Sequence, residues 1–185
     1  ERDTQGFTAK ASSEELGFRS ANLGSLVFQD TQALLLTRET SDLAALDARI
    51  QLALGGVAVG LGYAATQVGR AYAFERKQFG QPIARFQAIQ FKLADMLTEV
   101  EAGRLLLWQA ANSPEMPGAL AMARLFAGEA AMRAANECLQ IHGGYGFTEE
   151  FPAERLYRDA QLVKILAGSS QAQRLAVADA LLEKG

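Results

Sequence analysis

The sequence is short of the residues on which several classes of protein depend. Its one cysteine, Cys138, excludes an internal disulfide and a CxxC site, and fits a reducing compartment. Its one histidine, His142, argues against a metal cluster and is expected to cap a helix end. The net charge of −3 comes without a basic tract, which argues against nucleic-acid binding. No membrane span is expected, because the apolar run over 52–61 is short and interrupted by glycines, and no signal peptide is recognisable.

What the chain does contain is enough apolar sequence for a core. Hydrophobic residues make up 49% of the 185 residues, which suits one domain, or one domain and a fragment. Residues 6–10 and 24–29 alternate apolar and polar side chains and predict strands, with a third short strand expected at 17–20. Because so few strands are marginally stable alone, we expect residues 1–34 to end a larger β-domain that continues upstream.

Residues 35–185 form the second predicted domain, and it is helical. The first helix is expected over about 42–76, roughly 50 Å long, with Thr40 or Ser41 as its N-cap and Asp42 at its positive end. Glycines within a helix lower its stability, so they indicate either a kink or the close approach of another helix or a ligand. Five glycines fall within this helix, at positions 55, 56, 60, 62 and 69.

Further helices are expected over about 84–112, 118–141 and 168–183, with a short turn or helix over 152–160. The glycines of 143–146 are a natural end for the helix before them. Arg158 and Asp159 are expected to form a structural ion pair. The predicted fold class is mainly α, an antiparallel four-helix bundle preceded by a few β-strands.

Four sequence blocks occur in an order that resembles the C-terminal domain of acyl-CoA dehydrogenases. They are FERKQFGQPI with FQAIQ (74–83 and 86–90), QIHGGYG (140–146), ERLYRDA (154–160) and KILAGSSQAQR (164–174). The resemblance covers residues from about 42 to 185, and residues 16–20 resemble the end of the family's middle β-domain. It implies the family's fold, its FAD cofactor and its usual tetrameric assembly.

The resemblance also implies cofactor contacts. Arg76 matches an arginine that meets the FAD pyrophosphate, and a guanidinium suits phosphate oxygens, although a cation at a helix C-terminus is favourable in any case. Gln140 and Gly144 match a turn along the diphosphate of a neighbouring subunit's FAD, and Ser169 and Gln171 match the adenosine end. The positions that match the lining of the cofactor, or alternatively ordinary core packing, are Gln78, Phe79, Ile83, Phe86 and Ile89.

The catalytic base of the family is missing at both of its usual positions. The family reaction removes an α-proton from an acyl-CoA thioester with a glutamate and passes a β-hydride to the flavin. The glutamate position before Gly168 is Ala167, and the alternative position on the long helix is Ile50. Gln51 stands where an arginine near the thioester or CoA is usual, and is a candidate substrate contact. Asp47, about one helical turn before Ile50, is a weak candidate for an unusual base.

Three interpretations therefore remain open. The chain is the base-lacking subunit of a heteromeric acyl-CoA dehydrogenase, whose glutamate-containing paralogue shares the FAD site; such pairs occur in the family, notably for CoA thioesters of bulky steroid side chains. It is instead an active homomeric dehydrogenase with an unusual base such as Asp47, or a non-catalytic assembly protein on the same fold. The resemblance implies an electron-transferring flavoprotein-type acceptor, and a cytoplasmic or mitochondrial-matrix location.

Overall fold

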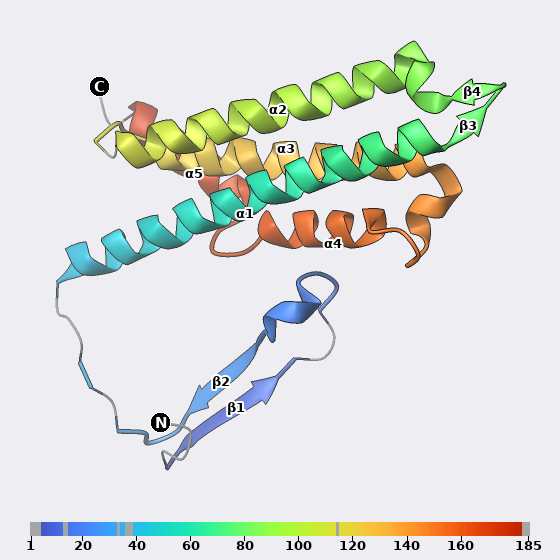
Figure 1. Ribbon diagram of the computed structural model, residues 1–185. Coiled ribbons are helices and arrows are strands. Elements are labelled where there is room, and N and C mark those ends of the chain that lie inside the picture. Colours follow the sequence, from blue (N-terminus) through green and yellow to red (C-terminus); the bar gives the residue numbers. More distant parts are fainter. Residues whose placement is uncertain (1–4, 13–14, 33, 36–38, 114, 183–185) are drawn as a thin grey trace.

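Four helices of the chain run alternately up and down, and a fifth packs beside them (Figure 1). The computed structural model describes residues 5–12, 15–32, 34–35, 39–113 and 115–182. The four are α1 (Thr40–Glu75), α2 (Gln87–Asn112), α3 (Ala119–His142) and α4 (Ala153–Val163), and the fifth is α5 (Ser170–Leu182). This arrangement confirms the predicted antiparallel bundle, and α4 shows that the segment left open as a turn or a helix is helical.

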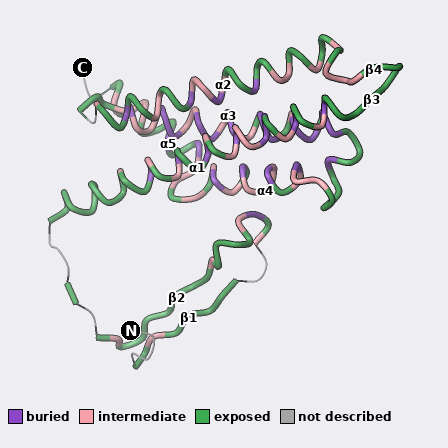
Figure 2. Tube along the Cα trace, viewed as in Figure 1, coloured by how far each residue is buried: buried purple, intermediate pink, exposed green. Residues whose placement is uncertain are grey.

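The centre of the bundle is α3, which packs against α1, α2, α4 and α5. Its sequence explains this position, because small alanine side chains let neighbouring helices approach closely. Figure 2 shows the buried residues concentrated where α1, α3 and α4 face one another. The buried alanines of α3 are Ala119, Ala123, Ala127, Ala130, Ala131, Ala134 and Ala135.

The long helix α1 begins close to its predicted start but with a different cap. Thr40 and Ser41 lie inside the helix, and Glu39 is the N-cap residue, without a side-chain hydrogen bond to the helix end. Neither hydroxyl residue therefore occupies the predicted capping position. Asp42 lies in the first turn, as expected, where a carboxylate is favoured by the helix dipole.

The glycines of α1 divide into two groups, and the first makes room for neighbouring helices. A Cβ atom added at Gly55 would lie 2.5 Å from a methyl carbon of Leu107, and one at Gly62 would lie 2.6 Å from Cγ2 of Val100. Gly69 is likewise buried against α3. Gly56 and Gly60 have no neighbouring atoms at the Cβ position. Close approach is therefore the reason for three of the five glycines.

Two glycines of α1 provide a matched test of this packing. We expect Gly62→Ala to lower the free energy of unfolding by about 1–3 kcal/mol, since the new methyl overpacks against buried Val100. Gly60→Ala should raise it by roughly 0.5–1 kcal/mol, because alanine favours the helix and meets no neighbour. Chemical denaturation of the two variants measures both changes. Changes of the same sign would contradict the packing assignment.

The strands form an antiparallel pair, β1 (Phe7–Ala11) and β2 (Gly24–Phe28), in which Ala9 lies opposite Leu26. The third strand predicted at 17–20 is wrong. Phe18 has a φ of +47°, which no strand residue adopts, and a 3-10 turn (η1, Arg19–Ala21) follows it. The local sequence reads as strand, but the contacts of this segment with α4 determine its conformation.

Those contacts join the strand pair to the bundle. The Phe18 backbone N–H donates to Oδ1 of Asp159 at 2.6 Å, and the Arg158 guanidinium donates to the Leu16 carbonyl. Arg158 pairs with Glu154 rather than with its neighbour Asp159 (Nε–Oε2 2.7 Å), so the predicted Arg158–Asp159 ion pair is wrong. The hydrogen bond from Arg158 outweighs burial and lowers the pKa of the Glu154 carboxyl.

Length and composition alone would allow α1 to cross a membrane. The helix nevertheless packs along α2, α3 and α4, burying Gly62, Ala65, Thr66 and Ala73 in the bundle. A core helix of a bundle has the same composition, so the expected absence of a membrane span remains a prediction.

Candidate functional site

A hollow of about 520 Å³ lies where the C-terminal ends of α1 and α3 meet. A 3-10 segment, η3 (Gly143–Phe147), forms its rim. Five of the residues matched to the cofactor line it together, although they come from two separate sequence blocks. These five are Arg76, Gln78, Ile83, Gln140 and Gly144.

Arg76 is held at the hollow by its backbone, while its side chain stays exposed. Its N–H donates to the Tyr72 carbonyl at 2.9 Å, and its carbonyl accepts from the Ile83 N–H at 2.8 Å. The guanidinium carbon lies 5.8 Å from the centre of the Tyr145 ring. Among the described residues no carboxylate is paired with Arg76, so its charge is available to an anion in the hollow.

The glycines after α3 leave backbone open to that hollow. Gly143 caps α3 with a φ of +59°, a conformation that favours glycine. Added Cβ atoms at Gly143 or Gly144 would meet nothing within 4 Å, whereas one at Gly146 would lie 2.8 Å from the Leu139 carbonyl oxygen. An open backbone beside a guanidinium and the Gln140 amide suits a diphosphate group. The residues present therefore fit the diphosphate of FAD.

Aromatic rings form one wall of the hollow. The buried His142 ring stacks on Tyr72 (centroids 4.1 Å apart) and lies edge-on to Phe151 at 5.5 Å. Nδ1 of His142 lies 2.8 Å from the Cys138 carbonyl oxygen, a bond that fixes the ring at the end of α3. Cys138 is fully buried, and burial raises the pKa of its thiol to about 12.

Sequence reasoning missed the hollow's remaining lining residues. Tyr72 lies one helical turn before Arg76, and that spacing is the signal that could have found it. His142 and Tyr145 lie within the QIHGGYG block but were given no cofactor role. The full set that was missed is Tyr72, Ile141, His142, Gly143, Tyr145 and Thr148.

Phe79 lies at the tip of a two-residue hairpin that projects from the end of the bundle (Figure 1). The hairpin joins β3 (Lys77–Gln78) to β4 (Gln81–Pro82). Phe79 has a φ of +50° and Gly80 one of +80°, the left-handed pair that such hairpins require. A phenylalanine is rarely placed in this conformation, and its side chain is 93% exposed. Within the described part of the chain, its ring contact is edge-on to Phe86, with centroids 6.2 Å apart.

The apolar positions behind the hairpin contribute to the core. Ile83, in the 3-10 turn η2 (Ile83–Arg85), and Ile89, in α2, both pack against the buried cluster of the bundle. Ile83 also lines the hollow, so it has core contacts and its cofactor contact stays a prediction. The contacts of Ile89 with the buried cluster support the interpretation that it is a core-packing residue.

The two remaining cofactor positions lie in a different place, at the start of α5. The hydroxyl of Ser169 accepts the Ala172 N–H at 3.3 Å, which makes Ser169 the N-cap of α5. Gln171 is exposed in the first turn. The loop before them contains Ala167 and Gly168 with φ angles of +51° and +115°. This loop, residues 164–169, is called here the α4–α5 loop.

One of the two usual base positions, Ala167, lies in this loop, and Gln51, the neighbour of the other position, contacts it. The Gln51 side chain donates to the Ala167 carbonyl and accepts from Nε2 of Gln173 at 3.2 Å. Gln51 is buried, and its amide is engaged within the chain, which makes it a packing residue here in addition to a candidate substrate contact. Its neighbour Ile50 is 42% exposed, and Asp47 is exposed about one turn earlier on α1.

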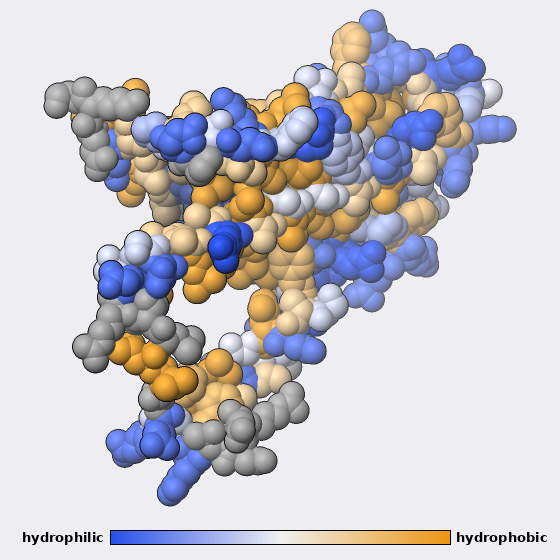
Figure 3. Space-filling model, turned by 60° about the vertical axis from the view of Figure 1, so that its left-hand side comes forward, coloured by the Kyte–Doolittle hydropathy of each residue, from blue (hydrophilic) through white to orange (hydrophobic). Residues whose placement is uncertain are grey.

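Figure 3 shows apolar side chains across much of the bundle face that comes forward, with hydrophilic side chains towards its ends.

The hollow and the α4–α5 loop lie at separate levels along α1. Gln51, which contacts the loop, precedes Arg76, which lines the hollow at the end of the helix, by 25 positions. At 1.5 Å per residue, the two positions lie about 37 Å apart. The cofactor-matched residues of one chain therefore form two separate half-sites.

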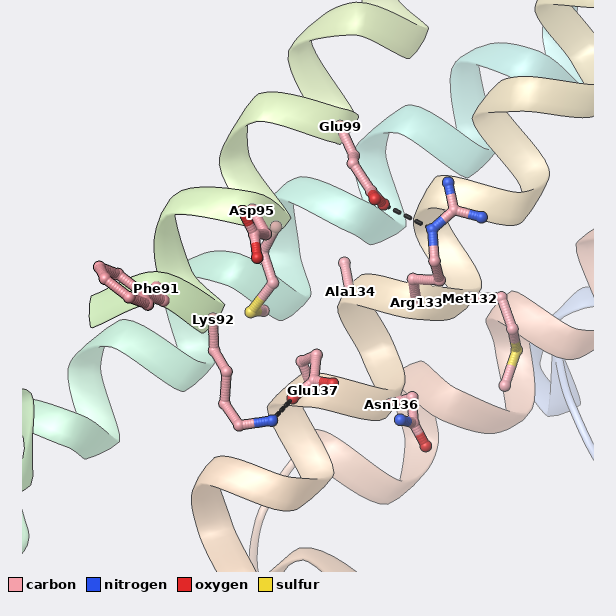
Figure 4. A pocket seen from close by; sticks show the side chains of 10 residues that line it. Phe91, Lys92, Asp95, Glu99, Met132, Arg133, Ala134, Asn136 and Glu137 are labelled. Carbon is pink, nitrogen blue, oxygen red and sulfur yellow. Dashed lines mark hydrogen bonds and ion pairs between the residues drawn. The ribbon is translucent and has the colours of Figure 1, made fainter. Parts of the chain in front are cut away.

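A second hollow, of about 500 Å³, lies between α2 and α3 and contains none of the candidate residues (Figure 4). Two ion pairs cross it: Lys92 with Glu137, and Arg133 with Glu99 at 2.6 Å. Asp95 and the exposed Phe91 also line it. Because its charged groups are largely paired with one another, it offers no free donor set for a cofactor.

Comparison with known proteins agrees with this geometry. The family described as acyl-CoA dehydrogenase, C-terminal domain, matches residues 47–182. The chain is 42% identical to the probable acyl-CoA dehydrogenase YngJ of Bacillus subtilis, over 98% of this chain and 50% of that protein. It is 37% identical to the mitochondrial short-chain specific acyl-CoA dehydrogenase of Bos taurus, over 97% and 46%.

Among solved structures, butyryl-CoA dehydrogenase from Megasphaera elsdenii superposes with a TM-score of 0.90 at 32% identity, over 98% of this chain and 50% of that one. The chain thus spans about half the length of the relatives it matches. With the bundle, the motif order and the family match in agreement, the chain belongs to the acyl-CoA dehydrogenase family, whose members are FAD-dependent flavoproteins.

Proposed function

We propose that the protein containing this chain is the base-lacking subunit of a heteromeric, FAD-dependent acyl-CoA dehydrogenase. In this proposal a glutamate-containing paralogue supplies the base, and both subunits hold the cofactor. The chain would act in the cytoplasm or the mitochondrial matrix, and an electron-transferring flavoprotein-type partner would take the electrons. Family membership supports the reaction class, the α,β-dehydrogenation of an acyl-CoA thioester.

The observation that carries the shared site is the division of the cofactor residues into two half-sites, one at the hollow beside Arg76 and one at the loop that Gln51 contacts about 37 Å earlier along α1. A FAD bound by the hollow of one chain needs the α4–α5 loop of another. The exposed Phe79 favours the same arrangement, because a phenylalanine held in a left-handed conformation at a projecting tip needs a surface to cover it.

Each half-site has a distinct task. In the hollow, Arg76 would hold the diphosphate with paired donors, and the open backbone at Gly144 would let it approach closely. At the loop, Ser169 and Gln171 would contact the adenosine end of a different FAD. Bound FAD would supply the hydride acceptor for the β-carbon. Removal of the α-proton is the step for which this chain has no carboxylate, since the two usual base positions are Ala167 and Ile50.

The test is anaerobic titration of the full-length protein with acyl-CoAs of several chain lengths, followed by the visible flavin band. For the protein alone, we expect flavin that stays oxidised, or no flavin. Co-expression with a glutamate-containing paralogue should give flavin that substrate bleaches. Bleaching of the protein alone would overturn the proposal and direct attention to Asp47, which lies on the same helix near Ile50. Absence of flavin from every assembly would instead favour a non-catalytic assembly protein.

A further inference from the structure

A buried arginine, Arg124, is the least expected side chain of the bundle. It lies in the second turn of α3 and is 2% exposed, among residues that are otherwise small and apolar. Gly128, one turn later, leaves space for it, since a Cβ there would lie 3.3 Å from Nη1 of Arg124. Its Nε is the one buried side-chain nitrogen or oxygen without a hydrogen-bond partner among the described residues. Burial lowers the pKa of the guanidinium.

A buried charge with an unmatched donor is costly to a fold, so the contacts that it does make indicate its task. Nη2 of Arg124 donates to the carbonyl of Val163, the last residue of α4, and to the Leu166 carbonyl at 3.3 Å. These carbonyls lie at a helix C-terminus, where they lack helical partners and a cation is favourable. Arg124 therefore fixes the start of the α4–α5 loop.

The same loop is fixed from the opposite side by Gln51. That side chain, which comes from α1, donates to the Ala167 carbonyl, the next carbonyl after Leu166. Gln173 of α5 donates to Gln51 at 3.2 Å, and its Nε2 would lie 3.2 Å from a Cβ added at Gly168. Side chains from two helices, α1 and α3, thus hold three carbonyls of one short segment, and Gln173 of α5 supports one of those side chains.

Ion pairs with Glu129 also hold the same segment at the protein surface. Lys164 donates to Glu129 at 3.2 Å, and Arg174 lies 3.6 Å from the same carboxylate. Burial alone would raise the pKa of Glu129, but hydrogen bonds from Ser170 and Lys164 outweigh it and lower the pKa. The left-handed Ala167 and the Ser169 cap are therefore held in place from within the bundle and from its surface.

We propose that Arg124 is a positioning residue for the cofactor: by holding the α4–α5 loop from inside the bundle, it sets the place of Ser169 and Gln171 against FAD. Gln51 is its counterpart on the other side of the loop. The inference rests on the proposed FAD site, and it assigns a role to a residue that touches neither cofactor nor substrate.

The experiment compares Arg124→Lys, Arg124→Met and Gln51→Leu in the full-length protein, with its paralogue where flavin binding requires one. One readout is hydrogen exchange of the Ile165 and Leu166 amides, which are bonded to the Leu162 carbonyl. The other is the rate of FAD release. Arg133→Met is the matched control, because Arg133 lies on the same helix but is exposed and paired with Glu99.

For Arg124→Met we expect hydrogen exchange of the Ile165 and Leu166 amides (loop exchange) and the rate of FAD release each to be faster on the order of tenfold or more. The reason is the loss of charge-assisted hydrogen bonds to the loop. Arg124→Lys keeps a donor for one carbonyl and should stay within a few-fold of the parent, which keeps the test valid if Arg124→Met does not fold. Gln51→Leu should change both readouts in the same direction. The double variant Arg124→Lys with Gln51→Leu should depart from additivity, since both side chains act on one loop.

Faster loop exchange with unchanged FAD release would overturn the proposal, because the loop would then be structural only. Unchanged loop exchange in Arg124→Met would overturn it as well. If the parent assembly binds no FAD, the proposed function fails, and the cofactor role of Arg124 fails with it. The exchange measurement would still show separately whether Arg124 holds the loop.

Discussion

Replacing Arg76 with alanine is expected to release FAD from the assembly while leaving the bundle folded. The side chain is exposed, and the two backbone bonds that hold residue 76 to Tyr72 and Ile83 do not depend on it. A charge-assisted bond contributes about 1.5–3 kcal/mol. The affinity for FAD should therefore fall about ten- to more than a hundredfold.

Flavin fluorescence after ultrafiltration measures this loss. Arg70→Ala is the control, because Arg70 also lies on α1 but contacts Phe74, at 5.2 Å from the ring centre, and does not line the hollow. Arg76→Lys should recover only part of the affinity, since an ammonium cannot present the paired donors of a guanidinium. Flavin retention equal to that of Arg70→Ala would show that the hollow is not a diphosphate site.

Placing a glutamate at position 167 is expected to give the chain a base of its own. Ala167 is exposed and already has a positive φ, so a longer side chain adds little backbone strain. Gln51 holds the carbonyl of this residue and not its side chain, so the loop geometry is retained. General-base catalysis contributes about 10²–10⁴-fold, and α-proton exchange of a bound acyl-CoA should rise by a factor in that range.

The measurement is deuterium incorporation at the α-carbon, with Ala167→Gln as a control of equal size that cannot accept the proton. Exchange that remains equal in the two variants, with FAD and thioester still bound, would mean that the loop does not face the α-carbon. Exchange in the unaltered chain at the rate of Ala167→Glu would instead indicate a base elsewhere, with Asp47 the first to replace.

The sequence predicts the helices of this bundle well because their signals are local. Apolar spacing, the glycines after His142 and the breaks near Gly80 and Pro117 define the elements within a few residues. Gly62 is harder, because whether a helical glycine marks a kink or a contact depends on Val100, far away in the sequence. The strand predicted near Phe18 fails for the same reason, since Asp159 of α4 holds that backbone.

The candidate site was predictable only where it resembles known motifs. Arg76, Gln140 and Gly144 line one hollow, and their contacts with FAD stay a prediction. The side chains that support the site have no comparable signal: an arginine at position 124 looks like one more surface cation in an alanine-rich helix. Its partners are backbone carbonyls, which carry no information about residue type. Such contacts become visible only after the fold has placed the α4–α5 loop over α3.

In the proposed heteromeric enzyme, the length of α1 determines what fraction of the bound flavins can react. Gln51 and Arg76, about 37 Å apart along this helix, would serve two different flavins, so every flavin would be held by both kinds of subunit. One flavin would face Ala167 and the other the paralogue's glutamate. Substrate could then bleach at most half of the bound flavin, and titration to that limit would count the active sites. A single missing carboxylate would halve the number of working centres without reducing the amount of cofactor held.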